Sequence, residues 1–144
     1  MFDELNKYKH NDHFFFKPSD NLRQVCNAPN DKSGVYIIFA LKNSRIELVY
    51  IGRSGEIKSD GSLFIRKAGL GGLMDRLVNG KQFGSARRNS WRTVMLVEKI
   101  EALDIYWYVT HNDQFVDCPK IIENKLLRKY FEIYGRLPKW NNEF

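Results

Sequence analysis

Cysteine is scarce in this sequence, which contains two such residues, Cys26 and Cys118. Neither belongs to a CxxC pair, so the chain lacks the disulfide framework that stabilises many small secreted proteins. A zinc site that combined these thiols with His10 and His13 would match no known spacing of zinc ligands. The sequence therefore favours free thiols over a structural metal centre.

Long hydrophobic runs are also missing. No stretch reaches the roughly 18 to 20 apolar residues that a membrane-spanning helix requires. The N-terminal residues include acidic and polar side chains where a signal peptide would have a basic start and an apolar centre. We therefore expect a soluble cytoplasmic protein. At 144 residues it has the size of one ordinary domain, with residues 1–32 as an N-terminal extension packed on a main domain of residues 33–144.

Acidic residues are fewer than basic ones, with 17 Asp and Glu against 23 Lys and Arg and a formal net charge of +6. The basic excess is concentrated between Arg53 and Lys99. Within this region, Arg88 and Arg92 flank amide, hydroxyl and aromatic side chains. This mixture is typical of surfaces that bind nucleic acid, although a solvated basic face would have the same composition.

Two runs rich in β-branched and aromatic residues, Gly34–Leu41 and Ile46–Arg53, flank a polar connection and predict a β-hairpin. Each run places a tyrosine near a glycine, Tyr36 in the first run and Tyr50 in the second. A two-residue turn at Asn43-Ser44 would put the two rings on opposite faces of the hairpin. A connection of three or five residues, or a β-bulge, would put them on the same face. The spacing alone leaves open whether the tyrosines act together.

Helical and extended patterns alternate in the rest of the chain. Residues 54–67 carry a turn signal at Asp60-Gly61 and predict a small inserted hairpin. The other expected elements are a helix over Gly71–Asn79, a basic loop over Lys81–Ser90, a helix over Trp91–Lys99 or a strand over Thr93–Val97, a strand over Leu103–Thr110, and a helix over Pro119–Tyr134.

Two of the predicted helices carry a charged residue in an unusual place. Arg76 lies at the edge of an apolar stripe, where a surface arginine with a partly buried stem is the simplest interpretation. Glu123 lies in the middle of the apolar stripe of the last helix, whereas the other charges of that helix lie on its polar side. A carboxylate on a core face is costly unless it is paired, binds a cation or faces a cleft. The alternatives are a structural salt bridge to Arg76 or another cation, and a ligand for a hard divalent metal such as Mg²⁺.

Taken in order, these residues resemble the motifs of the GIY-YIG nuclease superfamily. The resemblance rests on Gly34-Val35-Tyr36, Tyr50-Ile51-Gly52, Arg76, Glu123 and the closing Leu137–Asn141, and it covers roughly residues 33–142. The closing segment is most similar to the branch that contains restriction enzymes. The resemblance implies an α/β (α+β) fold in which a three-stranded, mainly antiparallel sheet is flanked by helices in the order ββααβα.

The resemblance also implies metal-dependent hydrolysis of DNA phosphodiester bonds by a stand-alone endonuclease of restriction or defence type. Tyr36 would be the general base for the attacking water, or its relay, and Tyr50 would hold the phosphate and the nucleophile. Arg76 would neutralise charge in the transition state. Glu123 would hold one Mg²⁺ or Mn²⁺ ion per active site, and Asn141 would orient the site by hydrogen bonding.

DNA is the partner that this activity requires. Cleavage of both strands by one site per chain would need a homodimer or two successive encounters. The cations expected to bind DNA are Arg53, Lys81, Arg87, Arg88 and Arg92.

Two features depart from the family pattern. Gly80 stands one helical turn after Arg76, where members often carry a histidine or tyrosine, so a proton-handling role at that position is missing. The insertion at residues 54–67 also makes Arg66 a rival for the catalytic arginine, and we favour Arg76 because it lies on a predicted helix.

Two other functions compete with a nuclease. One is a catalytically inactive nucleic-acid-binding domain of the same fold. The other is a structural or partner-binding protein in which Glu123 and Arg76 form a buried pair. The presence of a suitable residue at every proposed chemical position favours the enzyme.

Overall fold

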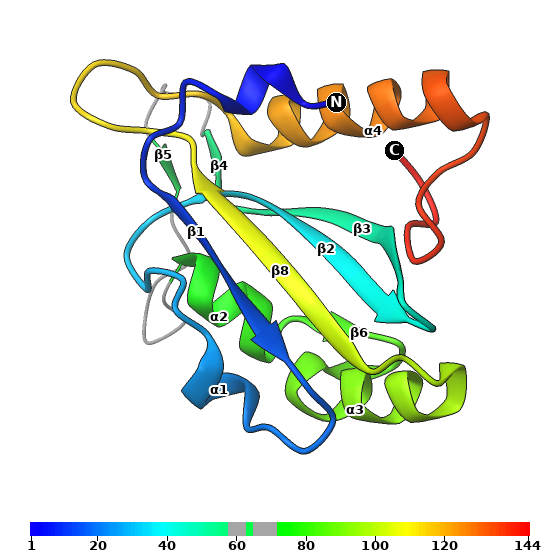
Figure 1. The fold of residues 1–144 in the computed structure, drawn as a ribbon. Coiled ribbons are helices and arrows are strands. Elements are labelled where there is room, and N and C mark those ends of the chain that lie inside the picture. Colours follow the sequence, from blue (N-terminus) through cyan, green and yellow to red (C-terminus); the bar gives the residue numbers. More distant parts are fainter. Residues whose placement is uncertain (58–62, 65–71) are drawn as a thin grey trace.

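The computed structural model describes residues 1–57, 63–64 and 72–144 of the chain. These residues form a central antiparallel sheet with helices on both of its faces (Figure 1). In chain order the elements are the 3-10 helix η1 (Asp3–Leu5), β1 (Asn11–Phe16), α1 (Leu22–Val25), β2 (Gly34–Lys42), β3 (Arg45–Ser54), β4 (Glu56–Ile57), β5 (Leu63–Phe64), α2 (Gly72–Asn79), β6 (Lys81–Gln82), β7 (Ser85–Ala86), α3 (Arg87–Glu98), β8 (Ala102–Val109) and α4 (Pro119–Tyr134).

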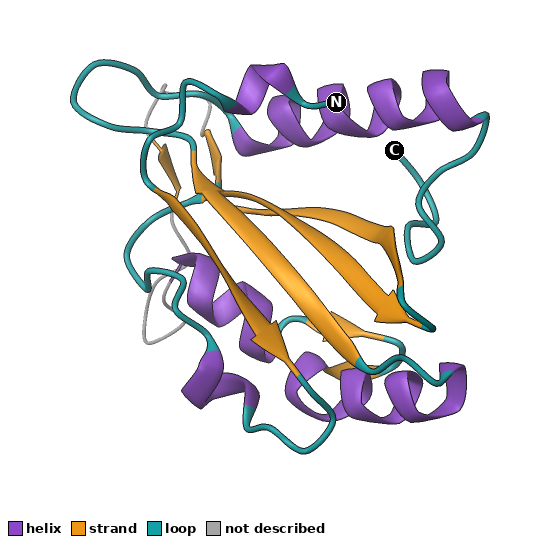
Figure 2. Ribbon diagram, viewed as in Figure 1, coloured by secondary structure: helices purple, strands orange, loops and turns teal. Residues whose placement is uncertain are grey.

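The sheet separates two helical layers. Its strands follow the order β1-β8-β2-β3, so β1 and β3 are its edges. Helices α1, α2 and α3 lie on one face of the sheet and α4 lies on the other (Figures 1 and 2). The predicted α+β class is confirmed, and the main elements from β2 onward follow the expected order ββααβα around the small hairpins.

The sheet has four strands where three were predicted, because the N-terminal segment supplies β1, which pairs with β8. Phe14 and Phe16 are buried, whereas Phe15 between them is 49% exposed. This is the alternation of a strand that covers a core on one face. Three consecutive phenylalanines conceal the alternation in the sequence.

The β2–β3 hairpin combines a two-residue turn with a β-bulge, which have opposite effects on side-chain direction. Its turn has two residues, Asn43 and Ser44, which both adopt positive φ angles, 52° and 61°. A bulge also shifts the register, because Ile38 pairs with Tyr50 while Phe39 pairs with Leu48. The extra residue in β3 reverses the effect of the tight turn on side-chain direction, so Tyr36 and Tyr50 lie on the same face.

The segment after Gly80 differs most from the prediction. The expected basic loop over residues 81–90 is instead a β6–β7 hairpin followed by the first turn of α3, which begins at Arg87. Of the two structures expected after residue 90, the helix is the one present, because α3 continues to Glu98. The inserted hairpin is present as the pair β4–β5, but the predicted turn at Asp60-Gly61 and the rival Arg66 lie outside the described residues.

The two long elements of the second half closely match their predicted ranges. β8 covers the expected strand within one residue, and α4 covers the expected helix and ends before Gly135. None of the helices in the described part of the chain combines the length and the apolar character needed to cross a bilayer.

The sheet divides the buried side chains into two groups. Alternation along β2 sends Val35 and Ile37 toward α4, and it sends Tyr36 and Ile38 toward α2 and α3. Tyr50 of β3 packs against the same group as Tyr36. The two tyrosines therefore belong to the α2–α3 side of the sheet, whereas Glu123 comes from the α4 side.

Candidate active site

A polar cleft with a volume of about 550 Å³ lies along β3, the edge strand of the sheet. Helix α2 contributes to it from one face of the sheet and α4 contributes from the other. The cleft therefore joins residues that the sheet would otherwise separate. The predicted site residues that line it are Tyr50, Arg53, Arg76, Lys81, Glu123 and Asn141.

Glu123 forms an ion pair across this cleft. The Oε1 atom of Glu123 lies 2.9 Å from Nη1 of Arg53. Glu123 is only 8% exposed. Burial raises the pKa of the Glu123 carboxyl group, and the positive charges of Arg53 and Arg76 oppose that rise. The carboxylate is therefore paired, as one of the two alternatives predicted, and it also lines a cleft, while its role as a metal ligand stays a prediction. Its partner is Arg53 rather than Arg76.

The residues near Glu123 can support a metal ion only with help from other ligands. Within residues 1–57, 63–64 and 72–144, no group of three or more His, Cys, Asp or Glu side chains could hold an ion by itself. Mg²⁺ commonly binds one or two carboxylates and completes its shell with water and substrate phosphate. Glu123 in a polar cleft beside two arginines therefore fits one ion that is shared with a phosphate group, and it does not fit a two-metal cage.

Tyr36 is fully buried and does not line the cleft. Its ring is stacked behind that of Tyr50, with 6.1 Å between the ring centroids. Its hydroxyl oxygen accepts a hydrogen bond of 2.7 Å from Nη1 of Arg87. Because a guanidinium is a donor without acceptor capacity, the Tyr36 proton must point toward another group. This arrangement favours the relay role of Tyr36 over direct contact with an attacking water.

Arg87 is a core residue, so the prediction that it contacts DNA is wrong. It is 1% exposed, and its guanidinium also donates to the Arg76 carbonyl oxygen at 2.9 Å and to Oε1 of Gln82 at 3.0 Å. The guanidinium carbon lies 5.2 to 5.4 Å from the ring centroids of Tyr36, Tyr50 and Trp91. The sequence held one signal of this burial: Arg87 and Trp91 are four residues apart, so in a helix they lie on the same face.

Tyr50 and Arg76 present hydrogen-bond donors to the cleft region. Burial, followed by the neighbouring Tyr36, raises the pKa of Tyr50 to about 12, although the positive charge of Arg87 opposes the rise. The Tyr50 hydroxyl therefore keeps its proton at neutral pH. The interaction with Tyr36 raises the pKa of Arg76, and the buried Nε of Arg76 has no hydrogen-bond partner among the described residues. Arg76 lines the cleft, and a permanent cation in that position is suited to an anionic ligand.

The tyrosine pair depends on a glycine in β3. Gly52 lies opposite Tyr36 in the hairpin. A Cβ atom at this position would lie 2.5 Å from Cζ and 2.6 Å from the hydroxyl oxygen of Tyr36, and 2.6 Å from Cε2 of Tyr50. The two rings therefore occupy the space that any larger residue would need.

The substitution Gly52→Ala is expected to lower the free energy of unfolding by about 1–3 kcal/mol, because overpacking forces both rings to move. Urea denaturation of both proteins measures the difference. Ser54→Ala is the matched control, since Ser54 is two residues along the same strand, is 2% exposed, and has a hydroxyl without a hydrogen-bond partner among the described residues. Equal stability of Gly52→Ala and the unmodified protein would contradict the packing described above.

Asn141 anchors the C-terminal segment to the edge of the sheet. Its Oδ1 accepts a hydrogen bond from the Ile51 amide, and its Nδ2 donates to the Ile51 carbonyl oxygen, both at 3.0 Å. The Trp140 amide donates to the Val49 carbonyl oxygen at 2.8 Å. Asn141 therefore orients one wall of the cleft through the backbone of β3.

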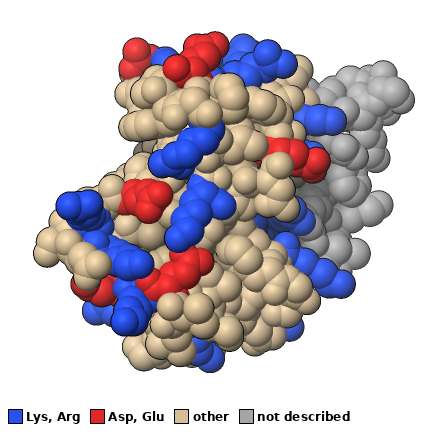
Figure 3. Space-filling model, turned by 90° about the vertical axis from the view of Figure 1, so that its right-hand side faces the viewer, with Lys and Arg blue, Asp and Glu red and all other residues tan. Residues whose placement is uncertain are grey.

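Two of the predicted DNA-binding residues lie elsewhere. Arg88 and Arg92 are exposed on α3 and do not line the cleft. Arg88 donates to Asn79, and Arg92 donates to the carbonyl oxygens of Pro18 and Asp20 at 2.6 and 3.0 Å. On the face drawn in Figure 3, basic and acidic side chains are interspersed rather than gathered into one basic patch. A DNA-binding role for Arg88 and Arg92 remains a prediction.

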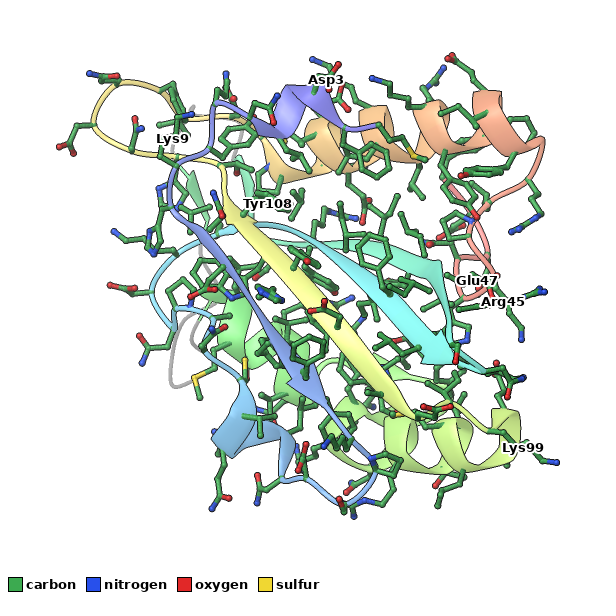
Figure 4. The ribbon with its side chains drawn as sticks, in the orientation of Figure 1. Asp3, Lys9, Arg45, Glu47, Lys99 and Tyr108 are labelled. Atoms are coloured by element: carbon green, nitrogen blue, oxygen red, sulfur yellow. The ribbon has the colours of Figure 1, made fainter. Side chains whose placement is uncertain are left out.

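A second hollow of about 670 Å³ lies between α4, η1 and the sheet. Figure 4 shows Tyr108 beneath α4 and Glu47 toward the turn end of β3, two of its lining residues. None of the predicted site residues lines it. Its Asp104 is 2.8 Å from Nδ1 of His13, and its Arg136 donates to the Tyr130 hydroxyl at 3.2 Å. Because its walls are mainly aromatic and aliphatic, the smaller polar cleft is the better candidate for phosphate chemistry.

Comparison of the chain with protein-family models, with curated proteins and with solved structures finds no significant match. The assignment of a function therefore depends on the residues and the geometry of the cleft.

Proposed function

We propose that the chain is a metal-dependent DNA endonuclease of restriction or defence type that hydrolyses phosphodiester bonds in the cytoplasm. The observation that supports this most directly is the meeting of Tyr50, Arg76 and Glu123, from three separate elements, in one polar cleft. A buried carboxylate, an arginine and a protonated phenol that line one cleft together suit a phosphate group and a divalent cation.

Each side chain has a role that its surroundings support. Arg76 and Arg53 neutralise the charge of the bound phosphate, and the charge on Arg76 is permanent. Tyr50 donates a hydrogen bond to a phosphate oxygen, because its hydroxyl keeps its proton. Glu123 holds the cation, and a bound Mg²⁺ would supply Lewis-acid stabilisation of charge on the phosphoryl oxygens. Tyr36 lies behind Tyr50 as a proton relay.

A catalytically inactive nucleic-acid-binding domain is the alternative, and one observation favours it. The Arg53–Glu123 ion pair already provides the carboxylate with a positive partner at 2.9 Å. If that pair stays closed when DNA binds, the phosphate meets the arginines and no cation is recruited.

The test is cleavage of a supercoiled plasmid by the purified protein in the presence of Mg²⁺, with EDTA in a parallel reaction and with Glu123→Gln as the variant. Nicked or linear DNA that requires both Mg²⁺ and Glu123 supports the nuclease. DNA binding without cleavage under any of these conditions favours the inactive domain, and absence of both binding and cleavage contradicts both proposals.

The raised pKa of Glu123 predicts a specific pH dependence of stability in metal-free solution. The folded state holds the Glu123 proton more tightly than the unfolded state does, so this group stabilises the fold most below the ordinary carboxyl pKa of 4.5. That contribution is lost as the pH rises through the higher folded-state value. We therefore expect the unfolding free energy of the unmodified protein to fall, relative to that of Glu123→Gln, as the pH rises from the ordinary carboxyl pKa of 4.5 through the higher pKa of the folded state. Urea denaturation of both proteins at a series of pH values, in EDTA, measures this difference, and a constant difference would contradict the burial of the acid.

A further inference from the structure

The β6–β7 hairpin carries an aromatic residue where its backbone disfavours one. Its two tip residues, Phe83 and Gly84, have φ angles of 56° and 90°. Turns with two consecutive positive φ angles prefer Asn-Gly, Asp-Gly or Gly-Gly, and a bulky residue at the first position is strained. Phe83 nevertheless remains 46% exposed, so burial gives limited compensation for that strain.

Phe83 lies at the candidate active site. Its ring lines the cleft and meets the ring of the buried Trp140 edge to face, with 5.1 Å between the centroids and 87° between the planes. This contact holds the ring in place while nearly half of the residue stays in solvent. A second exposed aromatic residue, Phe144, lines the same cleft.

The charges beside Phe83 indicate what its ring would meet. Lys81, two residues earlier, and Arg53 and Arg76 line the same cleft and attract a phosphate group. A nucleotide whose phosphate lies against these cations brings its base within reach of the cleft wall. Bases stack on exposed aromatic side chains regardless of sequence, because every base has a π-face. A base inside an intact duplex has both faces covered by its neighbours, so stacking on the protein requires an unstacked base.

We propose that Phe83 forms a base-stacking subsite, which binds an unpaired nucleobase adjacent to the phosphate held in the cleft. This inference rests on the proposed nuclease function, and it narrows the substrate to DNA with a single-stranded or readily unpaired nucleotide at the site of cleavage. The strained tip position then has a functional reason, since an asparagine there would suit the turn but would offer no ring.

The test compares the unmodified protein with Phe83→Asn and measures binding in EDTA, without cleavage. The probe is a single-stranded oligonucleotide that contains 2-aminopurine, whose fluorescence falls when it stacks. We expect Phe83→Asn to bind this strand about 5- to 150-fold more weakly, which corresponds to about 1–3 kcal/mol, and to lose most of the quenching. Binding to a fully paired duplex of the same sequence should change by less than about twofold, since paired bases do not stack on the protein.

Phe15→Asn is the matched control, because Phe15 is 49% exposed but lies on β1, at the opposite edge of the sheet from the cleft. It should leave affinity and quenching unchanged. Phe83→Asn is expected to fold, because asparagine suits the turn even though it loses the contact with Trp140. If it fails to fold, Phe83→Leu, which keeps an apolar side chain without a ring, serves in its place.

Equal affinity and equal quenching in the unmodified protein and the Phe83 variant would overturn the inference. An equal loss of affinity for the single strand and for the duplex would also overturn it. Because binding is measured without a divalent metal, the result is separate from that of the cleavage test. Stacking that depends on Phe83, in a protein that never cleaves DNA, would support the subsite and contradict the nuclease.

Discussion

Replacing Glu123 with glutamine is expected to lower the rate of Mg²⁺-dependent DNA cleavage by at least about 100-fold, because metal-ion stabilisation of a transition state contributes several kcal/mol. Glutamine keeps the size of the side chain and an oxygen atom that can accept a hydrogen bond from Arg53. It removes the charge that a divalent cation requires. The fold is therefore preserved while the proposed metal ligand is lost.

The cleavage rate is measured under single-turnover conditions, and DNA binding is measured in parallel by fluorescence anisotropy in EDTA. Binding should be unchanged or stronger in Glu123→Gln, since a negative charge near the phosphate is removed. Glu143→Gln is the matched control, because Glu143 lines the same cleft but is exposed at the chain end. The cleavage rate of Glu143→Gln should stay within about threefold of that of the unmodified protein, because solvent screens the charge of an exposed carboxylate. Unchanged cleavage by Glu123→Gln would remove this residue from the mechanism.

Replacing Arg87 with alanine is expected to lower the free energy of unfolding by about 2–4 kcal/mol. The change leaves a cavity among three aromatic rings and removes the donors to Tyr36, Gln82 and the Arg76 carbonyl oxygen. The folded state no longer has to bury a charged guanidinium, and this gain offsets only part of the loss. Cleavage should fall as well, because Tyr36 loses its hydrogen-bonded anchor.

The adjacent Arg88 provides the control for this experiment. It is exposed, so Arg88→Ala should change the free energy of unfolding by less than about 1 kcal/mol. Urea denaturation gives both values. Arg87→Met separates the two contributions, since methionine restores most of the volume but none of the hydrogen bonds. Similar effects of the two alanine substitutions would contradict the buried position of Arg87.

The sequence was informative where a residue broke a local pattern. Glu123 interrupts the apolar stripe of α4, and its burial in the structure follows directly from that position. Its partner was not predictable in the same way, because Arg53 is 70 residues away along the chain and the contact depends on how α4 packs on β3. Local periodicity identifies the face on which a residue lies but not the residue that it meets.

Other features were concealed because different structures share one local composition. Arg87 and Arg88 are identical in type, and the start of α3 alone decides which of them is buried. The common face of Tyr36 and Tyr50 needs the bulge at Val49 of β3, and neither Val49 nor its two neighbours is a glycine or another turn residue that would mark it. The fourth strand was hidden because three consecutive phenylalanines show no alternation.

The bonds from Trp140 and Asn141 to β3 have a consequence for how the protein behaves in solution. An uncovered edge strand can pair with a strand of another molecule, which is a common route to aggregation. Here the backbone groups of Val49 and Ile51 are already occupied by the C-terminal segment. The same few residues thus cover part of the edge strand and form a wall of the cleft. A substitution that detaches them is therefore expected to expose the edge strand to intermolecular pairing as well as to reshape the cleft.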